Sequence, residues 1–449
     1  MKWDLAIVAL IVLAVAAASS RLSGTSVTPA MVFVALGLLV GPLVADEFKL
    51  APDSSAVRTL AEGTLAIVLF LDASRIKLDA LRREYAVPLR LLGIGLPLTI
   101  ALGAVAAVLL FPQLTVAEAL VLAVLLAPTD AALGEAVVTE ARLPSRIRQG
   151  LNVESGLNDG ICVPVLLIVL AAADVEFKAS AAHGALRIVV EEIGYGIVAG
   201  VAAGVLVAAI VTVGSRRRLI AGSWLQVIPV AGAALAYGVA VALGGSGFIA
   251  AFVAGGFFGG LVGSESEAAS RFGEEIGELL GGVTFLVFGA VLLGNALEHL
   301  TWSVAAYAVL SLTVVRVLPV AVAMLGSGAR LQTVGFLGWF GPRGLASIVF
   351  AVIVVQEASL PGTNTILVAT YVTVGVSVMA HGITAAPLAR WYANWYEAHP
   401  THRRPAMESV PAAAHRTRGY RARKAAHEQL PSPDSDDPPE EVIGDHRRT

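Results

Sequence analysis

Long apolar runs are the feature that most limits how this chain can fold. A helix needs roughly 20 apolar residues to cross the hydrocarbon core of a bilayer, and about thirteen such runs follow one another along the 449 residues. Lipid offers no hydrogen-bond partner to backbone groups, so runs of this kind must form helices. The expected spans cover residues 4–20, 28–45, 57–73, 87–111, 115–139, 148–173, 185–213, 221–243, 247–263, 273–297, 301–325, 331–357 and 362–389.

The low share of charged residues supports the same conclusion. The chain is 56% hydrophobic and 14% charged, whereas soluble domains carry about 25% charged residues. We therefore expect an all-α polytopic membrane protein in contact with the lipid bilayer. The net charge of -3 gives no sign of a nucleic-acid partner, and none is expected. The single cysteine, Cys162, lies inside an apolar run, which excludes a disulfide scaffold or a cysteine-based zinc site.

The basic residues predict the orientation of the spans. Cytoplasmic loops of membrane proteins are enriched in Lys and Arg. Here such residues concentrate in alternate loops, at Arg21, Arg75, Lys77, Arg82, Arg83, Arg90, Arg142, Arg146, Arg148, Arg216, Arg217, Arg218, Arg271 and Arg330. This pattern places the N-terminus outside and the C-terminus in the cytoplasm. The first run also resembles a secretory signal peptide, but that assignment would put these loops outside, so we expect a membrane helix.

The composition changes after residue 390. Residues 391–449 contain few large apolar side chains, several prolines, a basic half and then an acidic half, and such a segment buries too little surface to fold alone. We expect a transmembrane domain over residues 1–390 and a disordered cytoplasmic tail over residues 391–449. About thirteen spans divide into six, a linker and six, which is typical of transporters built from two inverted six-helix repeats.

Two spans at matching positions carry a proline beside a charged residue. The fifth span contains APTD and the twelfth contains GPRG. Proline removes a backbone donor and clashes with the preceding turn, so Pro128 and Pro342 should unwind both helices near their middles. A packing kink explains the prolines less well, because Asp130 and Arg343 accompany them. We expect two broken helices that cross, as at the substrate sites of inverted-repeat transporters.

Four polar side chains interrupt the sixth span, in the motif ESGLND. A charge at the centre of a spanning helix costs about 2.5–3.5 kcal/mol on insertion scales, so this cluster needs a reason. Residues four apart share a helix face, which aligns Glu154 with Asn158 and Ser155 with Asp159. The second pair offers a hydroxyl and a carboxylate to one small volume, and these hard oxygen ligands suit an alkali cation such as Na⁺.

The unwound fifth span supplies further oxygens in this prediction. If its backbone near Thr129 lies opposite Ser155, its free carbonyls and the Asp130 carboxylate complete an oxygen cage with Asp159. A metal cation and H⁺ would then compete for the same acids, which is a sufficient physical basis for antiport. The opposing interpretation makes Asp159 only a hydrogen-bonding anchor between helices.

Three further groups inside the spans have predicted roles. Arg316 is the lone cation of the eleventh span, and because an unpaired guanidinium there is costly, we expect a structural ion pair with Glu154. Asp72, near the end of the third span, supplies a water-mediated ligand, lines the cytoplasmic entrance or marks the membrane edge. His381 is expected near a helix end, where capping or an interfacial role is favoured over pH sensing.

The motifs taken together resemble those of a known family. APTD, ESGLNDG, the arginine of LTVVRVL, GPRG and AHGITAAPLARW are similar to the motifs of the NhaP-type Na⁺/H⁺ antiporters, in the monovalent cation:proton antiporter-1 family of the sodium/hydrogen exchanger superfamily. The match covers about residues 1–390. One departure concerns the fifth span, where the family commonly has Pro directly after TD and this chain has Ala131.

The resemblance implies an NhaA/NhaP-like antiporter fold with assigned roles. Asp159 would be the essential ion- and proton-binding acid, and Asp130, Ser155 and the Thr129 backbone would help to bind Na⁺. Asn158 would stabilise the crossed helices. Because electrogenic relatives have a second Asp where Asn158 stands, exchange would be electroneutral, with one H⁺ per Na⁺ or Li⁺. A homodimer in the cell (inner) membrane is implied, with elevator movement of a six-helix core and no cofactor.

Other classes of protein fit the sequence less well. An intramembrane aspartyl protease needs one acid in a Gly-x-Gly-Asp setting, which this chain lacks. A cation channel would need a continuous pore and repeated selectivity elements. Exchange of K⁺ for H⁺ is the real competitor, because oxygen ligands alone do not decide the size of the ion. The sequence therefore predicts a cation/proton antiporter and no enzyme.

Overall fold

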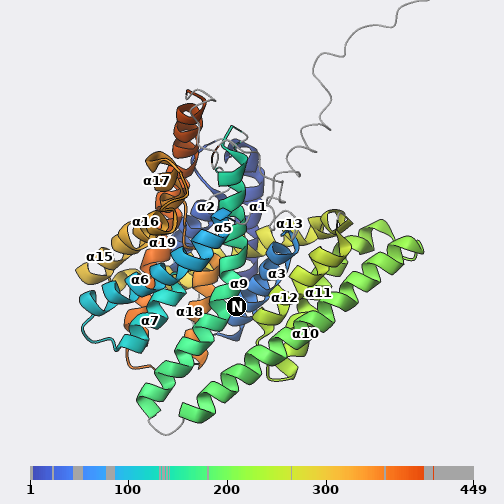
Figure 1. The fold of residues 1–449 in the computed structure, drawn as a ribbon, viewed down its shortest axis with the longest axis horizontal. Helices are drawn as coiled ribbons and strands as arrows, with labels where there is room; N and C mark the ends of the chain where they lie inside the picture. Colours follow the sequence, from blue (N-terminus) through green and yellow to red (C-terminus); the bar gives the residue numbers. More distant parts are fainter. Residues whose placement is uncertain are drawn as a thin grey trace, which may run out of the picture.

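The chain forms a bundle of helices (Figure 1). The computed structural model describes residues 4–22, 25–43, 54–76, 86–130, 133, 137, 140, 142–178, 182–263, 265–357, 360–398 and 408. Every regular element within these residues is a helix, which confirms the all-α prediction. The first half contains α1 (Asp4–Leu22), α2 (Pro29–Leu38), η1 (Leu39–Leu43), α3 (Ser55–Ser74), α5 (Ala86–Arg90), η2 (Leu91–Gly95), α6 (Leu96–Leu110), α7 (Val116–Leu125) and α9 (Ser145–Lys178).

The second half is helical in the same way. It contains α10 (Ala182–Arg216), α11 (Gly222–Ala242), α12 (Gly247–Val262), α13 (Glu265–Val287), η3 (Phe288–Leu293), α14 (Gly294–Glu298), α15 (Trp302–Leu312), α16 (Val314–Ala323), α17 (Leu331–Trp339), α18 (Leu345–Glu357) and α19 (Thr363–Glu397). In the described part of the chain, 8 helical stretches are long and apolar enough to cross a membrane. Shorter apolar helices accompany them, and the number of thirteen spans stays a prediction.

Two groups of helices lie on either side of α9. On one side α10 packs against α11 and α12, and α12 packs against α3. On the other side α6 packs against α7, and α15 packs against α16 and α19. Helix α9 contacts members of both groups, and Figure 1 shows it between them. The polar motif of α9 is therefore held at the centre of the molecule.

Glycines allow the first group to pack closely. A Cβ added at Gly200 of α10 would lie 2.7 Å from the carbonyl oxygen of Ala250, and one at Gly204 would lie 2.6 Å from that of Ala254. Gly255 of α12 likewise lies against the backbone of Phe70 in α3. Real Cβ atoms cannot approach this closely, so these glycines have the structural role expected for small residues between membrane helices.

Both predicted helix breaks are present. Helix α7 ends at Leu125, and residues 128–130 are not helical. Helix α17 ends at Trp339, and α18 begins only at Leu345. The predicted continuation of the fifth span through Glu135 to residue 139 lies mostly outside the described residues.

The eleventh span differs from the prediction of one helix over residues 301–325. It is divided into α15 and α16 at Thr313, whose backbone angles (φ -112°, ψ -91°) are not helical. Pro319 lies further along α16 and removes the donor that would bond the carbonyl of Val315. The hydrogen bond that Pro319 removes lies within α16, so this proline does not account for the break at Thr313.

The last helix continues past the boundary predicted at residue 390. Helix α19 runs to Glu397, because Tyr392 packs against α17, where its ring stacks 4.4 Å from that of Phe336. Within the predicted tail the structure describes Glu408, which is 2% exposed. Its Oε1 accepts hydrogen bonds from the backbone N–H of Arg330 (2.9 Å) and the hydroxyl of Thr333 (2.7 Å). The rest of the tail from residue 399 lies outside the described residues.

Candidate cation and proton site

The polar residues of the ESGLND motif all lie in one helix, α9, and all are buried. Their exposed fractions are 2% for Glu154, 6% for Ser155, 1% for Asn158 and 8% for Asp159. Asp72 of α3 lies close by, since a Cβ added at Gly156 would be 3.7 Å from the Cβ of Asp72. Buried polar groups are costly without partners, so the contacts of these side chains indicate what they do.

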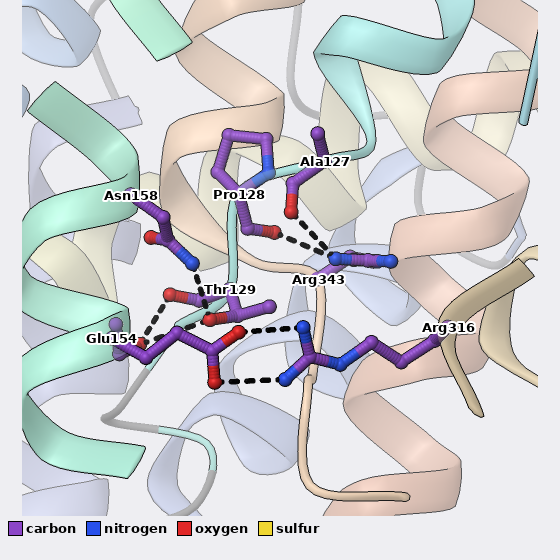
Figure 2. A network of polar contacts seen from close by, with 8 residues as sticks. Ala127, Pro128, Thr129, Glu154, Asn158, Arg316 and Arg343 are labelled. Carbon is purple, nitrogen blue, oxygen red and sulfur yellow. Dashed lines mark hydrogen bonds and ion pairs between the residues drawn. The ribbon is translucent and has the colours of Figure 1, made fainter. Parts of the chain in front are cut away.

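Thr129 of the unwound fifth span contacts α9 directly (Figure 2). The Nδ2 amide of Asn158 donates to the hydroxyl of Thr129 over 2.6 Å. The hydroxyl of Ser155 donates to the carbonyl oxygen of Thr129, and the two hydroxyl oxygens lie 3.4 Å apart. The structure thus brings together three of the predicted residues. The Thr129 carbonyl was expected to be free and instead accepts this hydrogen bond, which leaves its second lone pair for a cation.

The two broken helices cross at Asp130 and Arg343. The backbone N–H of Asp130 donates to the carbonyl of Pro342 (2.8 Å), and Oδ2 of Asp130 accepts from the N–H of Leu345, at the start of α18 (3.1 Å). The Nη1 of Arg343 donates to the carbonyls of Ala127 (2.8 Å) and Pro128 (3.2 Å), just beyond the end of α7.

The contact of each charged side chain with the end of the other broken helix has an electrostatic reason. The start of a helix carries partial positive charge and the end carries partial negative charge. Asp130 therefore stabilises the start of α18, while Arg343, which is 0% exposed, stabilises the carbonyls that follow α7. Whether Asp130 also shares a cation with Asp159 stays a prediction.

Glu154 and Arg316 form a buried ion pair (Figure 2). Nη1 of Arg316 lies 2.6 Å from Oε1 of Glu154, and Nη2 lies 2.9 Å from Oε2, so the contact is bidentate. Each side chain is 3% exposed. Gly341 of the twelfth-span break lies against the Arg316 guanidinium. The pairing expected from the sequence is present, and its structural role stays a prediction.

Asp72 lies at the end of α3 beside a buried arginine. Its Oδ1 is 2.7 Å from Nη1 of Arg75, and Nε of Arg75 is 3.4 Å from Oε1 of Glu274. The ion pair gives Asp72 a local partner, and Asp72 lies close to α9 at Gly156. A role at the cytoplasmic entrance or at the membrane edge stays a prediction. A role in binding the cation stays a prediction.

A contact of α19 with the unwound twelfth span was not expected from the sequence. The backbone N–H of Arg343 donates to Oγ of Ser377 over 2.6 Å. Nε2 of His381 lies 3.0 Å from the carbonyl oxygen of Trp339. The position expected for His381 was wrong, because α19 extends to Glu397 and the ring is 1% exposed. Its position four residues after Ser377 was the one signal that the two share a helix face.

The oxygen atoms gathered here suit an alkali cation rather than a transition metal. Among the residues that the structure describes, no group of three or more His, Cys, Asp or Glu side chains could hold a metal ion. Ser155, whose hydroxyl bonds Thr129, lies four residues, about one helix turn, before Asp159 in α9. A cation site that combines these oxygens with Asp159 stays a prediction.

A bundle of apolar helices in which two broken helices cross at charged residues defines the class of secondary transporters. The profile described as "Sodium/hydrogen exchanger, transmembrane" matches residues 6–391, and the chain belongs to this family. This result confirms the family expected from the motifs. The family consists of transporters, so the protease alternative is not supported.

Individual relatives are similar to this chain in sequence, and a solved structure is similar to it in fold. The "K(+)/H(+) antiporter NhaP2" of Shewanella oneidensis is 26% identical over 373 residues, which cover 80% of this chain and 62% of the relative. The "Na(+)/H(+) antiporter" of Schizosaccharomyces pombe is 28% identical over 256 residues, 54% of each chain. The sodium proton antiporter MjNhaP1 of Methanocaldococcus jannaschii has the same fold, with a TM-score of 0.70 and 20% identity over 86% of this chain and 97% of that chain. The chain spans about 62% of the length of the NhaP2 relative.

Proposed function

We propose that this chain exchanges a monovalent cation, foremost Na⁺ and also Li⁺, for H⁺ across the membrane. The observation that carries the proposal is the junction of Thr129 with Ser155 and Asn158. In this junction the uncharged oxygens of Thr129 contact Ser155 and Asn158, which precede Asp159 by four residues and by one residue. Membership of the sodium/hydrogen exchanger family supports the same activity.

In this mechanism Asp159 holds either the cation or the proton. Asp159 is 8% exposed, and neutralisation by a cation or by a proton lowers the cost of burying its charge. The oxygens of Thr129 and Ser155 replace part of the hydration shell of the cation, and Asp130 and Asp72 are further proposed ligands, each of which already has a protein partner. The neutral side chain of Asn158 leaves one charge to be neutralised per cycle, which supports electroneutral exchange of one H⁺ per cation.

The assembly and orientation belong to the same proposal. We infer that the chain lies in a bacterial inner membrane with its N-terminus outside and its C-terminus in the cytoplasm, because the basic residues concentrate in alternate loops. We further infer a homodimer whose core moves like an elevator around the site. The long helices α10 and α11, which carry many exposed large apolar residues, fit contact with lipid or a second copy.

Exchange of K⁺ for H⁺ is the second candidate function. One observation favours it, since the relative from Shewanella oneidensis carries the name of a K(+)/H(+) antiporter. The ligands on α9 and in the fifth span are the same for both ions, because Na⁺ and K⁺ both take oxygen ligands. The two candidates differ in the size of the cation and not in the residues that bind it.

The decisive experiment replaces Asp159 with Asn in the full chain, reconstituted into vesicles with a pH-sensitive dye. The expected result is loss of proton flux driven by Na⁺, Li⁺ or K⁺, because Asn cannot release a proton, while gel filtration shows a folded protein. Glu118→Gln is the matched control, since Glu118 is 1% exposed and its carboxylate bonds the backbone N–H groups of Thr115 and Gly362, neither of which belongs to the site. Full flux in the Asp159→Asn variant would contradict the proposal. Flux with K⁺ alone in the unaltered protein would select the second candidate.

A further inference from the structure

Two side chains of α19 hold both ends of the unwound twelfth-span segment. Ser377 is 0% exposed and accepts the backbone N–H of Arg343 (2.6 Å). His381 is 1% exposed, and its Nε2 faces the carbonyl of Trp339, the last residue of α17 (3.0 Å). The segment between Trp339 and Arg343 is not helical, and it is also held by the bonds of Gly341 to Trp339 and of Asp130 to Pro342. The contacts of Ser377 and His381 add to these and help to determine where it lies.

The hydrogen atoms of this network follow from its acceptors. A carbonyl oxygen can only accept, so Nε2 of His381 carries the hydrogen that bonds Trp339. Nδ1 lies 3.2 Å from the hydroxyl of Ser377 and 3.0 Å from the carbonyl of the same residue. The ring thus bonds Trp339 through Nε2 and Ser377 through Nδ1, and so joins the two ends of the segment.

The unwound twelfth-span segment is linked through Arg343 to Thr129, the residue of the fifth span that is proposed to bind the cation. Arg343 bonds the carbonyls of Ala127 and Pro128, and the next residue along the chain is Thr129. Figure 2 shows the Arg343 guanidinium beside this stretch of backbone. A displacement of Arg343 would therefore move the carbonyl and hydroxyl of Thr129 relative to Ser155.

We propose that Ser377 and His381 are positioning residues, which hold the unwound twelfth span and, through Arg343, place the Thr129 ligands of the cation. This inference rests on the proposed function and adds two residues to its site. They do not touch the cation, so their loss weakens cation binding without removing the acid that exchanges the proton. A residue that merely stabilised the fold would lower the amount of active protein and leave the affinity unchanged.

The test compares Ser377→Ala, His381→Asn and His381→Gln in full-length protein in vesicles, with Na⁺ as the driving ion. The amide nitrogen of Gln takes the place of Nε2, whereas Asn is too short to reach Trp339. We expect the apparent KM for Na⁺ to rise roughly tenfold in Ser377→Ala and His381→Asn, as for a lost buried hydrogen bond, with the maximal rate largely retained. His381→Gln should recover most of the affinity. Thr373→Val is the matched control, because this buried hydroxyl on α19 bonds the carbonyl of Ala369 and not the segment.

A binding measurement separates this inference from the proposed function. The rise in Tm that Na⁺ produces in the purified protein reports affinity without transport. Weaker stabilisation in Ser377→Ala and His381→Asn than in Thr373→Val supports the inference even in a preparation without exchange. An unchanged KM and an unchanged Na⁺ effect on Tm in both variants would overturn it. The proposed function would survive that result, because it depends on Asp159.

Discussion

Glu154 and Arg316 show what a charged residue requires inside a membrane domain. Both oxygens of the carboxylate bond the guanidinium, and each side chain is 3% exposed. Removing one partner of such a pair leaves an uncompensated charge, whereas removing both leaves none. The pair joins α9 to α16, so its geometry also helps to determine where the polar motif of α9 lies.

We therefore predict different outcomes for single and double substitutions of this pair. Glu154→Gln and Arg316→Gln should each cost about 3–5 kcal/mol of stability, and the double variant should cost clearly less. Thermal unfolding in detergent measures the difference. Arg58→Gln is the control, because the pair of Arg58 with Glu62 is exposed on the arginine side and such pairs contribute at most about 1 kcal/mol. A double variant less stable than both single variants would contradict the prediction.

The pairing could be predicted because few charges inside the spans were available to pair. The acceptors of Arg343 could not, since they are the backbone carbonyls of Ala127 and Pro128, and a carbonyl has no signature in the sequence. For the same reason the contact of His381 with the Trp339 carbonyl was missed. Side-chain partners can be inferred from charge, but backbone partners become visible only when the chain is folded.

The short helix α17 shows how an element depends on its surroundings. It has nine residues and no side-chain cap within its own sequence, and isolated helices of this length are marginal in water. Residues outside α17 make hydrogen bonds to both of its ends. Glu408 accepts the N–H of Arg330 at its start, and His381 bonds the carbonyl of Trp339 at its end.

Glu408 should therefore stabilise α17 from the predicted tail. We predict that Glu408→Ala lowers stability by about 1–3 kcal/mol, because the part-buried N–H of Arg330 loses its acceptor and the hydroxyl of Thr333 loses one of its two partners. The Tm of the purified full chain measures this effect. Glu397→Ala is the control, since its carboxylate is half exposed and lies 3.9 Å from Arg142. Equal Tm values for the two variants would show that the contact of Glu408 adds no stability.

At the scale of elements, the sequence predicted the two breaks that have a proline beside a charge, and it missed the kink at Gly41 and the break at Thr313. Pro128 and Pro342 marked the fifth and twelfth spans correctly. The break at Thr313 has no proline or glycine beside it. The end of α19 was placed too early, because the stacking of Tyr392 on Phe336 depends on a helix distant in sequence. The local sequence predicts where a helix loses a backbone hydrogen bond. It does not predict where a helix is extended by packing against a segment that is distant in sequence.

Considered as a whole, the molecule is held together at its centre by contacts between its two halves. Glu154 pairs with Arg316, and Asp130 bonds both Pro342 and Leu345. The polar centre lies where α9 meets the two unwound segments. A cation bound there would contact both α9 and the fifth span, so binding should stabilise the entire bundle and not one helix.

We accordingly predict that Na⁺ raises the Tm of the purified protein, and more so at high than at low pH. The reason is competition, because a ligand that binds only the folded state stabilises it, by about 2.7 kcal/mol at 100 times its Kd, and protons displace the cation from Asp159. Scanning fluorimetry with Na⁺, and with choline as an ion too large for the site, measures the effect. An equal Na⁺ effect at both pH values, or an equal effect of choline, would contradict competition at one site.

The bond from Arg343 to Ala127 joins residues 216 positions apart, and this separation has a consequence during synthesis. A ribosome adding about 5–20 residues per second needs roughly 10–40 seconds to cover that distance. During this time the fifth span has already been synthesised, but the carbonyls of Ala127 and Pro128 still lack their donor, the guanidinium of Arg343. The nascent chain must therefore keep an unfinished span sheltered, by water, lipid headgroups or the insertion machinery, until its second half arrives.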